Sequence, residues 1–228
     1  MRQFGLIVTS VARRSGGVQI TGAGSAPIFA PGQAALAMSQ LPAQPLLRMP
    51  LYPFHSLPSG LEFCVAEGEH PYGALHPGDE LDVLGPCGRG FVLPERPGHL
   101  LLAADTVARL MSVLDWAVER GWSVALWLPP GAPPPGLLPE LVEMHRQELS
   151  AELLGWAVVV ALDLPDPARR AAEIRAALPG RAPGFVQALV PTAVPMPCGT
   201  GACQACWVPA GVGSRRRLAC VDGPVFQW

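Results

Sequence analysis

Four cysteines near the end of this 228-residue chain have the spacing C-x4-C-x2-C-x13-C, and they are Cys198, Cys203, Cys206 and Cys220. The first three follow the local ligand spacing of plant-type [2Fe–2S] proteins. A cluster of this kind needs thiolates that converge on two irons, inside a tight loop whose backbone N–H groups approach the sulfurs. The spacing therefore predicts a [2Fe–2S] site in a compact, loop-rich module over residues 191–228.

The residues between these cysteines suit such a loop. Gly199 and Gly201 can adopt positive φ and let the backbone come close to a ligand. Ala202 keeps the loop slim. We therefore expect Gly199, Gly201 and Ala202 to supply the backbone donors around the cluster.

Three other interpretations of the cysteines compete with the iron–sulfur one. Structural zinc usually shows two C-x2-C pairs, or one with a Cys/His pair, and the nearest histidine here is the distant His145. Disulfides need an oxidising compartment, for which the chain carries no signal. A redox dithiol at Cys203 and Cys206 would leave Cys198 and Cys220 unexplained. The iron–sulfur interpretation is favoured, with zinc and disulfides as the alternatives.

The remaining two cysteines are predicted to be small buried hydrophobes and not ligands. Cys64 lies in the apolar run 61–65, and Cys87 lies in a glycine-rich turn.

Two segments with different secondary-structure patterns precede the cysteine module. Residues 1–97 show short β-rich runs broken by turns, which predicts a small antiparallel barrel. Residues 98–190 alternate strand and helix patterns, which predicts a parallel sheet with crossover helices. The expected strands are 99–103, 123–128, 156–162 and 184–190, and the expected helices are 106–120, 139–153 and 167–178. Asp105 and Asp166 are the expected caps of the first and last of these helices.

Composition excludes several function classes. The net charge is −2, which argues against a nucleic-acid partner. All 16 basic residues are arginines, so Schiff-base chemistry and a phosphate-binding lysine are excluded.

Since no run of about 18 apolar residues occurs, no membrane span is expected. The first residues lack a secretory pattern, so we expect a cytoplasmic protein.

The end of the chain resembles one family. The x13 spacing is followed by Val-Asp-Gly-Pro-Val-Phe at 221–226, and this stretch is similar to the C-terminal module of the electron-transfer subunit of dihydroorotate dehydrogenase B. Plant-type ferredoxins match less well, because their fourth ligand lies further downstream. Residues 31–33 and 77–91 show weaker similarity to the same family.

The resemblance implies an α+β multidomain, ferredoxin-reductase-like protein. Its parts would be a flavin-binding antiparallel β-barrel over 1–97, a nucleotide-binding α/β parallel-sheet domain over 98–190, and the [2Fe–2S] module over 191–228. It also implies a dihydroorotate dehydrogenase-like catalytic partner and a role in pyrimidine biosynthesis.

The flavin motif of that family is altered here. The family holds the flavin pyrophosphate with an Arg-Pro-x-Ser segment, and Met49 and Tyr52 stand where its arginine and serine belong. Arg48 is displaced by one residue, and neighbouring strand positions point to opposite faces. A second phosphate-contacting segment carries Glu69, which would repel a pyrophosphate. Flavin binding is left undecided, with Arg48 and Tyr52 as the candidate contacts for FAD.

The nicotinamide motif is altered more strongly. The family has a glycine-rich turn after the first strand of the α/β domain, where the backbone approaches a diphosphate. Residues 102–108 contain no glycine, and Asp105 adds a negative charge. We therefore expect no NAD(P)H binding.

These features predict an electron-transfer subunit that uses its cluster and that is not a self-sufficient enzyme. The alternatives are a scaffold or redox-sensing protein with a degenerate reductase body, and a working FAD-dependent NADH reductase with unusual contacts. Trp207, Phe226 and Trp228, together with the arginines 215–217, are expected to form a docking surface for the partner.

Overall fold

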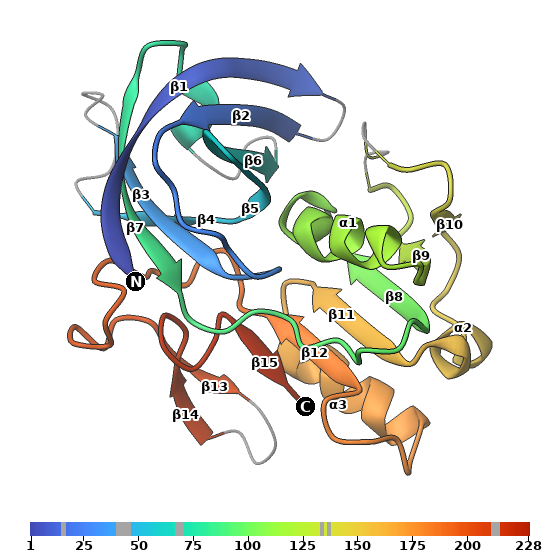
Figure 1. Ribbon diagram of the computed structural model, residues 1–228. Helices are drawn as coiled ribbons and strands as arrows, with labels where there is room; N and C mark the ends of the chain where they lie inside the picture. Colours follow the sequence, from blue (N-terminus) through green and yellow to red (C-terminus); the bar gives the residue numbers. More distant parts are fainter. Residues whose placement is uncertain (15–16, 40–46, 67–70, 133–134, 136–137, 211–214) are drawn as a thin grey trace.

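The computed structural model describes the chain except for residues 15–16, 40–46, 67–70, 133–134, 136–137 and 211–214. In the described part, seven strands pair in an antiparallel sheet with the order β4-β3-β7-β1-β2-β6-β5, which curls into a nearly closed barrel (Figure 1). The strands are β1 (Arg2–Arg14), β2 (Gly17–Ala23), β3 (Ala34–Ser39), β4 (Met49–Leu51), β5 (Pro53–Leu57), β6 (Gly60–Ala66) and β7 (Glu80–Cys87). A short 3-10 helix, η1 (Pro71–Ala74), precedes β7. The predicted barrel is confirmed.

Alternating side chains fill the barrel. Ile20 on β2 pairs with Phe63 on β6, and both are fully buried. On β7, Leu81 and Val83 point inward while Asp82 between them is half-buried. This period of two is what a sheet with one covered face requires.

The second sheet of the described chain has the order β10-β9-β8-β11-β12-β15. Its strands are β8 (His99–Ala104), β9 (Ser123–Trp127), β10 (Glu143–His145), β11 (Val159–Asp163), β12 (Val186–Leu189) and β15 (Val225–Gln227). All neighbours run parallel except β15, which is antiparallel to β12. The predicted parallel sheet with crossover helices is confirmed.

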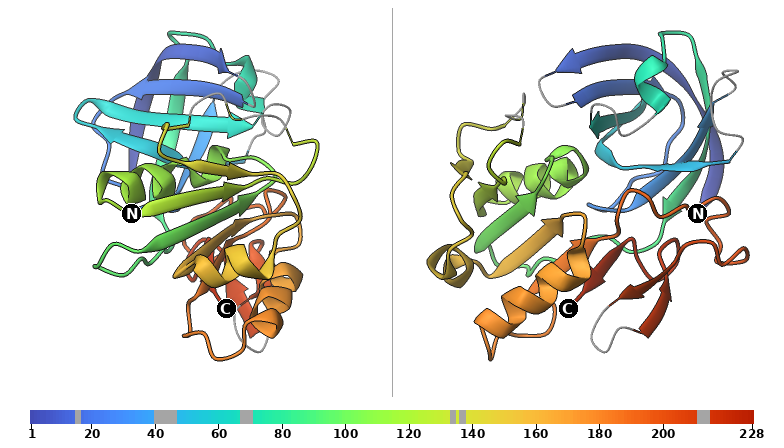
Figure 2. Two further views of the ribbon diagram at one scale, coloured as in Figure 1. Left: turned by 90° about the vertical axis from the view of Figure 1, so that its right-hand side faces the viewer. Right: turned by 180° about the vertical axis from the view of Figure 1, so that it is seen from behind.

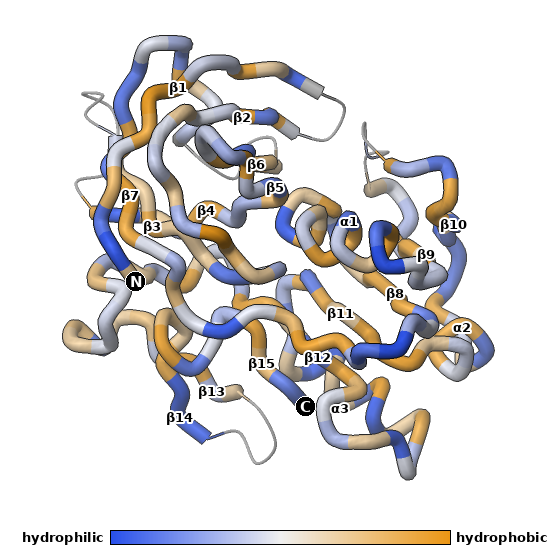
Figure 3. The backbone as a smooth tube through the Cα atoms, viewed as in Figure 1, coloured by the Kyte–Doolittle hydropathy of each residue, from blue (hydrophilic) through white to orange (hydrophobic). Residues whose placement is uncertain are grey.

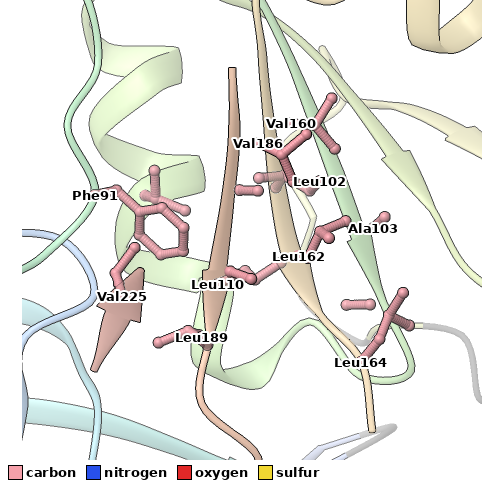
Figure 4. Close-up of a cluster of buried hydrophobic side chains, with 14 of the residues drawn as sticks. Phe91, Leu102, Ala103, Leu110, Val160, Leu162, Leu164, Val186, Leu189 and Val225 are labelled. Carbon is pink, nitrogen blue, oxygen red and sulfur yellow. The ribbon is translucent and has the colours of Figure 1, made fainter. Parts of the chain in front are cut away.

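Helices cover both faces of this sheet. The helix α1 (Met111–Glu119), which follows the 3-10 turn η2 (Ala108–Leu110), lies on the face toward the barrel, and α3 (Pro167–Ala177) lies on the opposite face (Figure 2). The strands are consequently apolar on both sides, as buried parallel strands are. Figure 4 shows their side chains, among them Leu102, Leu162 and Val186, together with Phe91 and Val225 from outside the parallel strands.

The helix expected over 106–120 begins later than predicted, and Asp105 does not cap it. The first turn, η2, is a 3-10 turn, and the residue that precedes α1 is Leu110, which makes no side-chain cap. The Asp105 amide instead donates to the Asp163 carbonyl of β11 at 3.2 Å. Asp105 thus continues the pairing of β8 with β11, and for this reason it does not cap the helix.

The helix expected over 139–153 is wrong. Glu143–His145 form β10, an edge strand parallel to β9, and the short α2 (Ala151–Trp156) follows with Ser150 as its cap. The Leu128 amide donates to the His145 carbonyl at 3.0 Å, and the Trp127 indole donates to a carbonyl just beyond it. The sheet edge therefore takes a segment whose local pattern is helical.

The end of this domain agrees with the sequence. Asp166 caps α3 by accepting from the Arg169 amide at 3.2 Å, as predicted. The strand expected from residue 156 starts at Val159, because Trp156 ends α2.

The three segments that carry the family resemblance meet at one place. The side-chain amide of Gln33 donates to the Gly88 carbonyl at 2.9 Å, and the backbone amide of Val225 donates to the Arg89 carbonyl at 3.3 Å. A Cβ on Gly88 would lie 1.8 Å from the carbonyl oxygen of Gly223. Only a glycine permits this approach, so the barrel, the connector after β7 and the C-terminal module are locked together here.

The last residues of the chain lie in the core and not on a docking surface. Phe226 and Trp228 are each 8% exposed, because β15 joins the sheet beside β12. The Trp228 amide donates to the Val186 carbonyl at 2.9 Å, and Arg175 donates to the Trp228 carbonyl at 2.8 Å. The predicted docking role of these two aromatics is wrong. In the described residues, no helix is long and apolar enough to cross a membrane.

Candidate metal centre

The cysteine loop packs against the barrel. A Cβ on Gly199 would lie 2.9 Å from Leu36, 3.1 Å from Leu84 and 3.2 Å from the Cys87 sulfur. After the loop, the chain forms a two-stranded sheet of β13 (Trp207–Ala210) and β14 (Arg215–Leu218) and then returns to Cys220. The barrel wall and this hairpin therefore hold the loop between them.

The four cysteines fall into two pairs. The sulfurs of Cys206 and Cys220 lie 3.3 Å apart, and these residues are 0% and 2% exposed. The Ala219 amide donates to the Cys206 carbonyl at 3.0 Å, which fixes the two backbones beside each other. In the other pair, the Cys203 thiol hydrogen-bonds to the sulfur of Cys198.

Backbone amides point at the sulfurs. The N–H groups of Thr200 and Cys203 donate to Cys198, and that of Gly201 donates to Cys220. Gly199 and Gly201 have φ values of 68° and 78°, in the left-handed region, and this turns the loop amides inward. Gly201 donates as predicted from the sequence. The backbone donors Thr200 and Cys203 were not predicted, because their side chains do not indicate where their backbone N–H groups point.

These contacts change the acidity of two thiols in opposite directions. Burial raises the pKa of Cys198, but hydrogen bonds from Cys203 and Thr200 outweigh it and bring the pKa to about 6. Burial beside Cys206 raises the pKa of Cys220 to about 12. Because iron binds the thiolate, metal binding at Cys220 must release a proton into the site.

The other two cysteines differ from this set. Burial raises the pKa of both Cys64 and Cys87 to about 11. Cys87 is 1% exposed and contacts the Gly199 side of the loop. Cys87 is buried as predicted, whereas Cys64 is only half-buried; both thiols stay neutral at physiological pH.

The donor set fits a [2Fe–2S] cluster. In the described part of the chain no three side chains of His, Cys, Asp or Glu gather around one point, but two pairs of thiols suit two irons with two protein ligands each, and inward amides meet the negative charge on the sulfurs. One edge of the loop is exposed, since Ala202, Cys203 and Gln204 are all exposed. The Cys206–Cys220 pair is buried, so the site runs from the interior of the module to its surface.

A substitution at Gly199 tests this cradle. Gly199→Ala adds a Cβ that contacts Leu36, Leu84 and Cys87 closely at a φ that alanine tolerates poorly. We expect the variant to retain less than half of the iron of the wild type, measured as iron and sulfide per chain after anaerobic purification. The control is Gly180→Ala, which has a φ of 88° but no atom within 4 Å of the added Cβ. Equal iron in Gly199→Ala and in the wild type would contradict the tight cradle.

The two candidate flavin contacts are engaged inside the protein. Arg48 forms an ion pair with Asp82, and Tyr52 is buried with the Arg109 guanidinium 5.4 Å from its ring centroid. Tyr52, Cys64 and Arg109 line a cavity of about 30 Å³. Among the described residues, the Tyr52 hydroxyl is buried there without a hydrogen-bond partner. Glu69 lies outside the described residues, and flavin binding stays undecided.

An internal ion pair and a further carboxylate line the place expected for a nicotinamide nucleotide. The strand order reverses between β8 and β11, where open α/β sheets bind ligands at the carboxyl ends of the strands. Here Arg109 donates to both carboxylate oxygens of the buried Asp163, and to the Val190 carbonyl at 2.8 Å. Asp105 lines the same 220 Å³ pocket. A pyrophosphate would face two carboxylates and an arginine that is already paired, so these residues do not fit a dinucleotide.

Comparison with known protein families identifies the module. Residues 195–228 match the family model described as the iron–sulfur cluster binding domain of dihydroorotate dehydrogenase B. The C-terminal module is a dihydroorotate dehydrogenase B-type iron–sulfur domain. It carries a [2Fe–2S] cluster. Comparison of the sequence with curated proteins gives no match.

Solved structures show the fold of the body on which this domain sits. An NADH-dependent reduced ferredoxin–NADP oxidoreductase aligns with a TM-score of 0.74 at 17% identity, over 97% of this chain and 87% of that chain. Phthalate dioxygenase reductase, described as a modular structure for electron transfer from pyridine nucleotides to [2Fe–2S], aligns with a TM-score of 0.59 at 13% identity, over 90% and 86%. The ferredoxin reductase of carbazole 1,9a-dioxygenase aligns with a TM-score of 0.60 at 16% identity, over 81% of this chain and 68% of that chain. The chain thus has the ferredoxin-reductase-like fold that the sequence predicts.

Proposed function

We propose that this protein is an electron-transfer subunit whose [2Fe–2S] cluster is ligated by Cys198, Cys203, Cys206 and Cys220. It exchanges electrons with a dihydroorotate dehydrogenase-like catalytic subunit in the cytoplasm. The cluster supplies a one-electron carrier. The observation that supports this assignment best is the pairing of the four sulfurs within a loop whose amides point inward.

The residues of the chain hold and tune this carrier. The N–H groups of Thr200, Gly201 and Cys203 stabilise negative charge on the ligand sulfurs, which favours the reduced form. We assign Gly199 and Ala202 to the same loop: Gly199 provides the close contact with the barrel, and Ala202 keeps the exposed edge slim. The buried pair Cys206 and Cys220 excludes water from the inner side.

The body of the protein supports a subunit and not an independent reductase. At the strand reversal Arg109 is paired with Asp163, and a second carboxylate, Asp105, lines the pocket. Met49 and Tyr52 stand where the family has its flavin-binding arginine and serine. Neither the scaffold nor the NADH reductase alternative is favoured, because the cysteine module is intact and the body lacks the two nucleotide contacts.

Reduction of the purified protein tests the assignment. We expect two irons and two sulfides per chain after anaerobic purification. Dihydroorotate together with a dihydroorotate dehydrogenase catalytic subunit should bleach the cluster absorbance. Each dihydroorotate oxidised to orotate releases two electrons and two protons, so it reduces two clusters. NADH alone should not bleach the cluster. A wild-type protein without iron, or rapid bleaching by NADH alone, would contradict the proposal.

A further inference from the structure

The hairpin that follows the cysteine loop has two different faces. Trp207 and Pro209 point to one face of β13, and Val208 and Ala210 point to the other, as the strand period of two requires. Ala210 is buried, and together with Arg217 it lines a 250 Å³ cavity against β15. The face with Val208 and Ala210 is therefore packed against the body, and the opposite face is open.

The open face is apolar at its centre. Trp207 is 45% exposed, Pro209 is exposed, and Leu218, which pairs with Trp207, is half-buried. The Arg216 guanidinium lies 4.4 Å from the centroid of the Trp207 ring. The Trp207 indole therefore offers a large apolar area to a partner, because aromatic side chains bury the largest apolar areas.

This face continues into the exposed edge of the metal centre. A Cβ on Gly201 would lie 3.1 Å from Leu218 and 3.2 Å from Val221. Val221 is 45% exposed, and the neighbouring ligand Cys203 is exposed as well. The open face of the hairpin and the exposed side of the cysteine loop are therefore one surface. We define the hairpin face as Trp207, Pro209, Arg216, Leu218 and Val221.

The hairpin face carries one positive charge, that of Arg216, although the net charge of the chain is −2. Arg215, Arg216 and Arg217 follow one another on β14 and are all exposed (Figure 3 shows β14 as hydrophilic), but Arg215 and Arg217 pair with Ala210 and Val208 and point to the other face. Arg217 has an acidic neighbour, Asp222, at 3.9 Å. Arg216 lies on the open face over Trp207 and points its charge toward solvent.

We propose that the hairpin face is the docking surface for the electron-transfer partner, and that the partner presents carboxylates around an apolar pocket that receives Trp207. This inference rests on the proposed function. Tryptophan and arginine are the residues that most often dominate binding energy, and complementary charge raises association rates. Docking at this face places the partner beside Cys203, where the protein layer over the metal centre is thinnest.

The rate of cluster reduction by the dihydroorotate-reduced catalytic subunit tests the inference. Trp207→Ala and Arg216→Ser should each raise the half-saturating concentration of the subunit at least about tenfold. The visible circular dichroism and the iron content should stay unchanged. The matched control is Arg215→Ser, which removes the same charge from the same strand but from the opposite face. The control should change the half-saturating concentration less than threefold.

Three distinguishable outcomes would contradict either the proposed docking surface or the proposed function on which it rests. If the wild type is reduced and both face variants behave like the control, the partner docks elsewhere. If sedimentation shows a wild-type dimer that Trp207→Ala dissociates, a second copy of this chain occupies the face. If the wild type contains its cluster but the subunit does not reduce it, the proposed partner itself is wrong.

Discussion

Replacing any one of Cys198, Cys203, Cys206 and Cys220 by serine is expected to abolish or severely deplete the [2Fe–2S] cluster. The loss should be most complete for Cys206→Ser and Cys220→Ser, because this pair is buried and no water can substitute as a ligand. The exposed Cys203 offers water access, so Cys203→Ser should yield a labile cluster that bleaches in air. Iron and sulfide per chain, with the visible circular dichroism, measure the result.

The same experiment contains its own control. Cys64→Ser removes a thiol outside the loop, where burial alone accounts for its pKa of about 11. It should keep two irons per chain. Retention of two irons in all four ligand variants would exclude the proposed ligand set. Loss of iron in Cys64→Ser as well would show that the assay reports general misfolding.

The sequence was sufficient for the features that depend on local chemistry. The barrel strands follow from a period of two, seen for example at Leu81 and Val83, and α3 follows from the Asp166 cap. The cysteine spacing predicted the loop, and the positive φ at Gly199 and Gly201 follows from glycine being the residue that adopts it most readily. In each case, the residues that determine the structure are close together in the chain.

The predictions from sequence fail where the local structure depends on pairing with segments that are distant in the chain. Residues 143–145 are a strand because the edge of β9 lies beside them, which no local pattern indicates. The terminal position of Trp228 favours exposure, but β15 pairs with β12, almost forty residues earlier. The helical pattern after Asp105 predicts a cap there, whereas its amide donates to the Asp163 carbonyl on β11.

One departure in the sequence has a structural counterpart that sequence reasoning missed. The absence of glycine at 102–108 indicated the loss of a diphosphate turn, but nothing local indicated what takes its place. The structure shows that Arg109 reaches across the strand reversal to Asp163, which is 54 residues away. A buried ion pair thus lines the crevice that an open α/β sheet offers to a ligand.

Removing one partner of this ion pair should destabilise the protein strongly. Arg109→Met leaves the Asp163 carboxylate, which is 6% exposed, without its guanidinium. An uncompensated buried charge costs about 3–5 kcal/mol in the free energy of unfolding. We expect the midpoint of urea unfolding, followed by tryptophan fluorescence, to fall accordingly. Arg169→Met on α3, whose side chain is 60% exposed and makes only surface ion pairs, should lower it by less than about 1 kcal/mol.

The double variant distinguishes an ion pair that stabilises from one that merely fills space. Arg109→Met combined with Asp163→Leu removes both charges and keeps apolar volume between β8 and β11. Because replacing a buried pair by apolar groups is often neutral, this variant should recover most of the lost stability. It should still not be reduced by NADH, since the turn at 102–108 remains without glycine. If the double variant is as unstable as Arg109→Met, then the contact of Arg109 with the Val190 carbonyl or with Tyr52, and not the compensation of charge, holds this part of the fold.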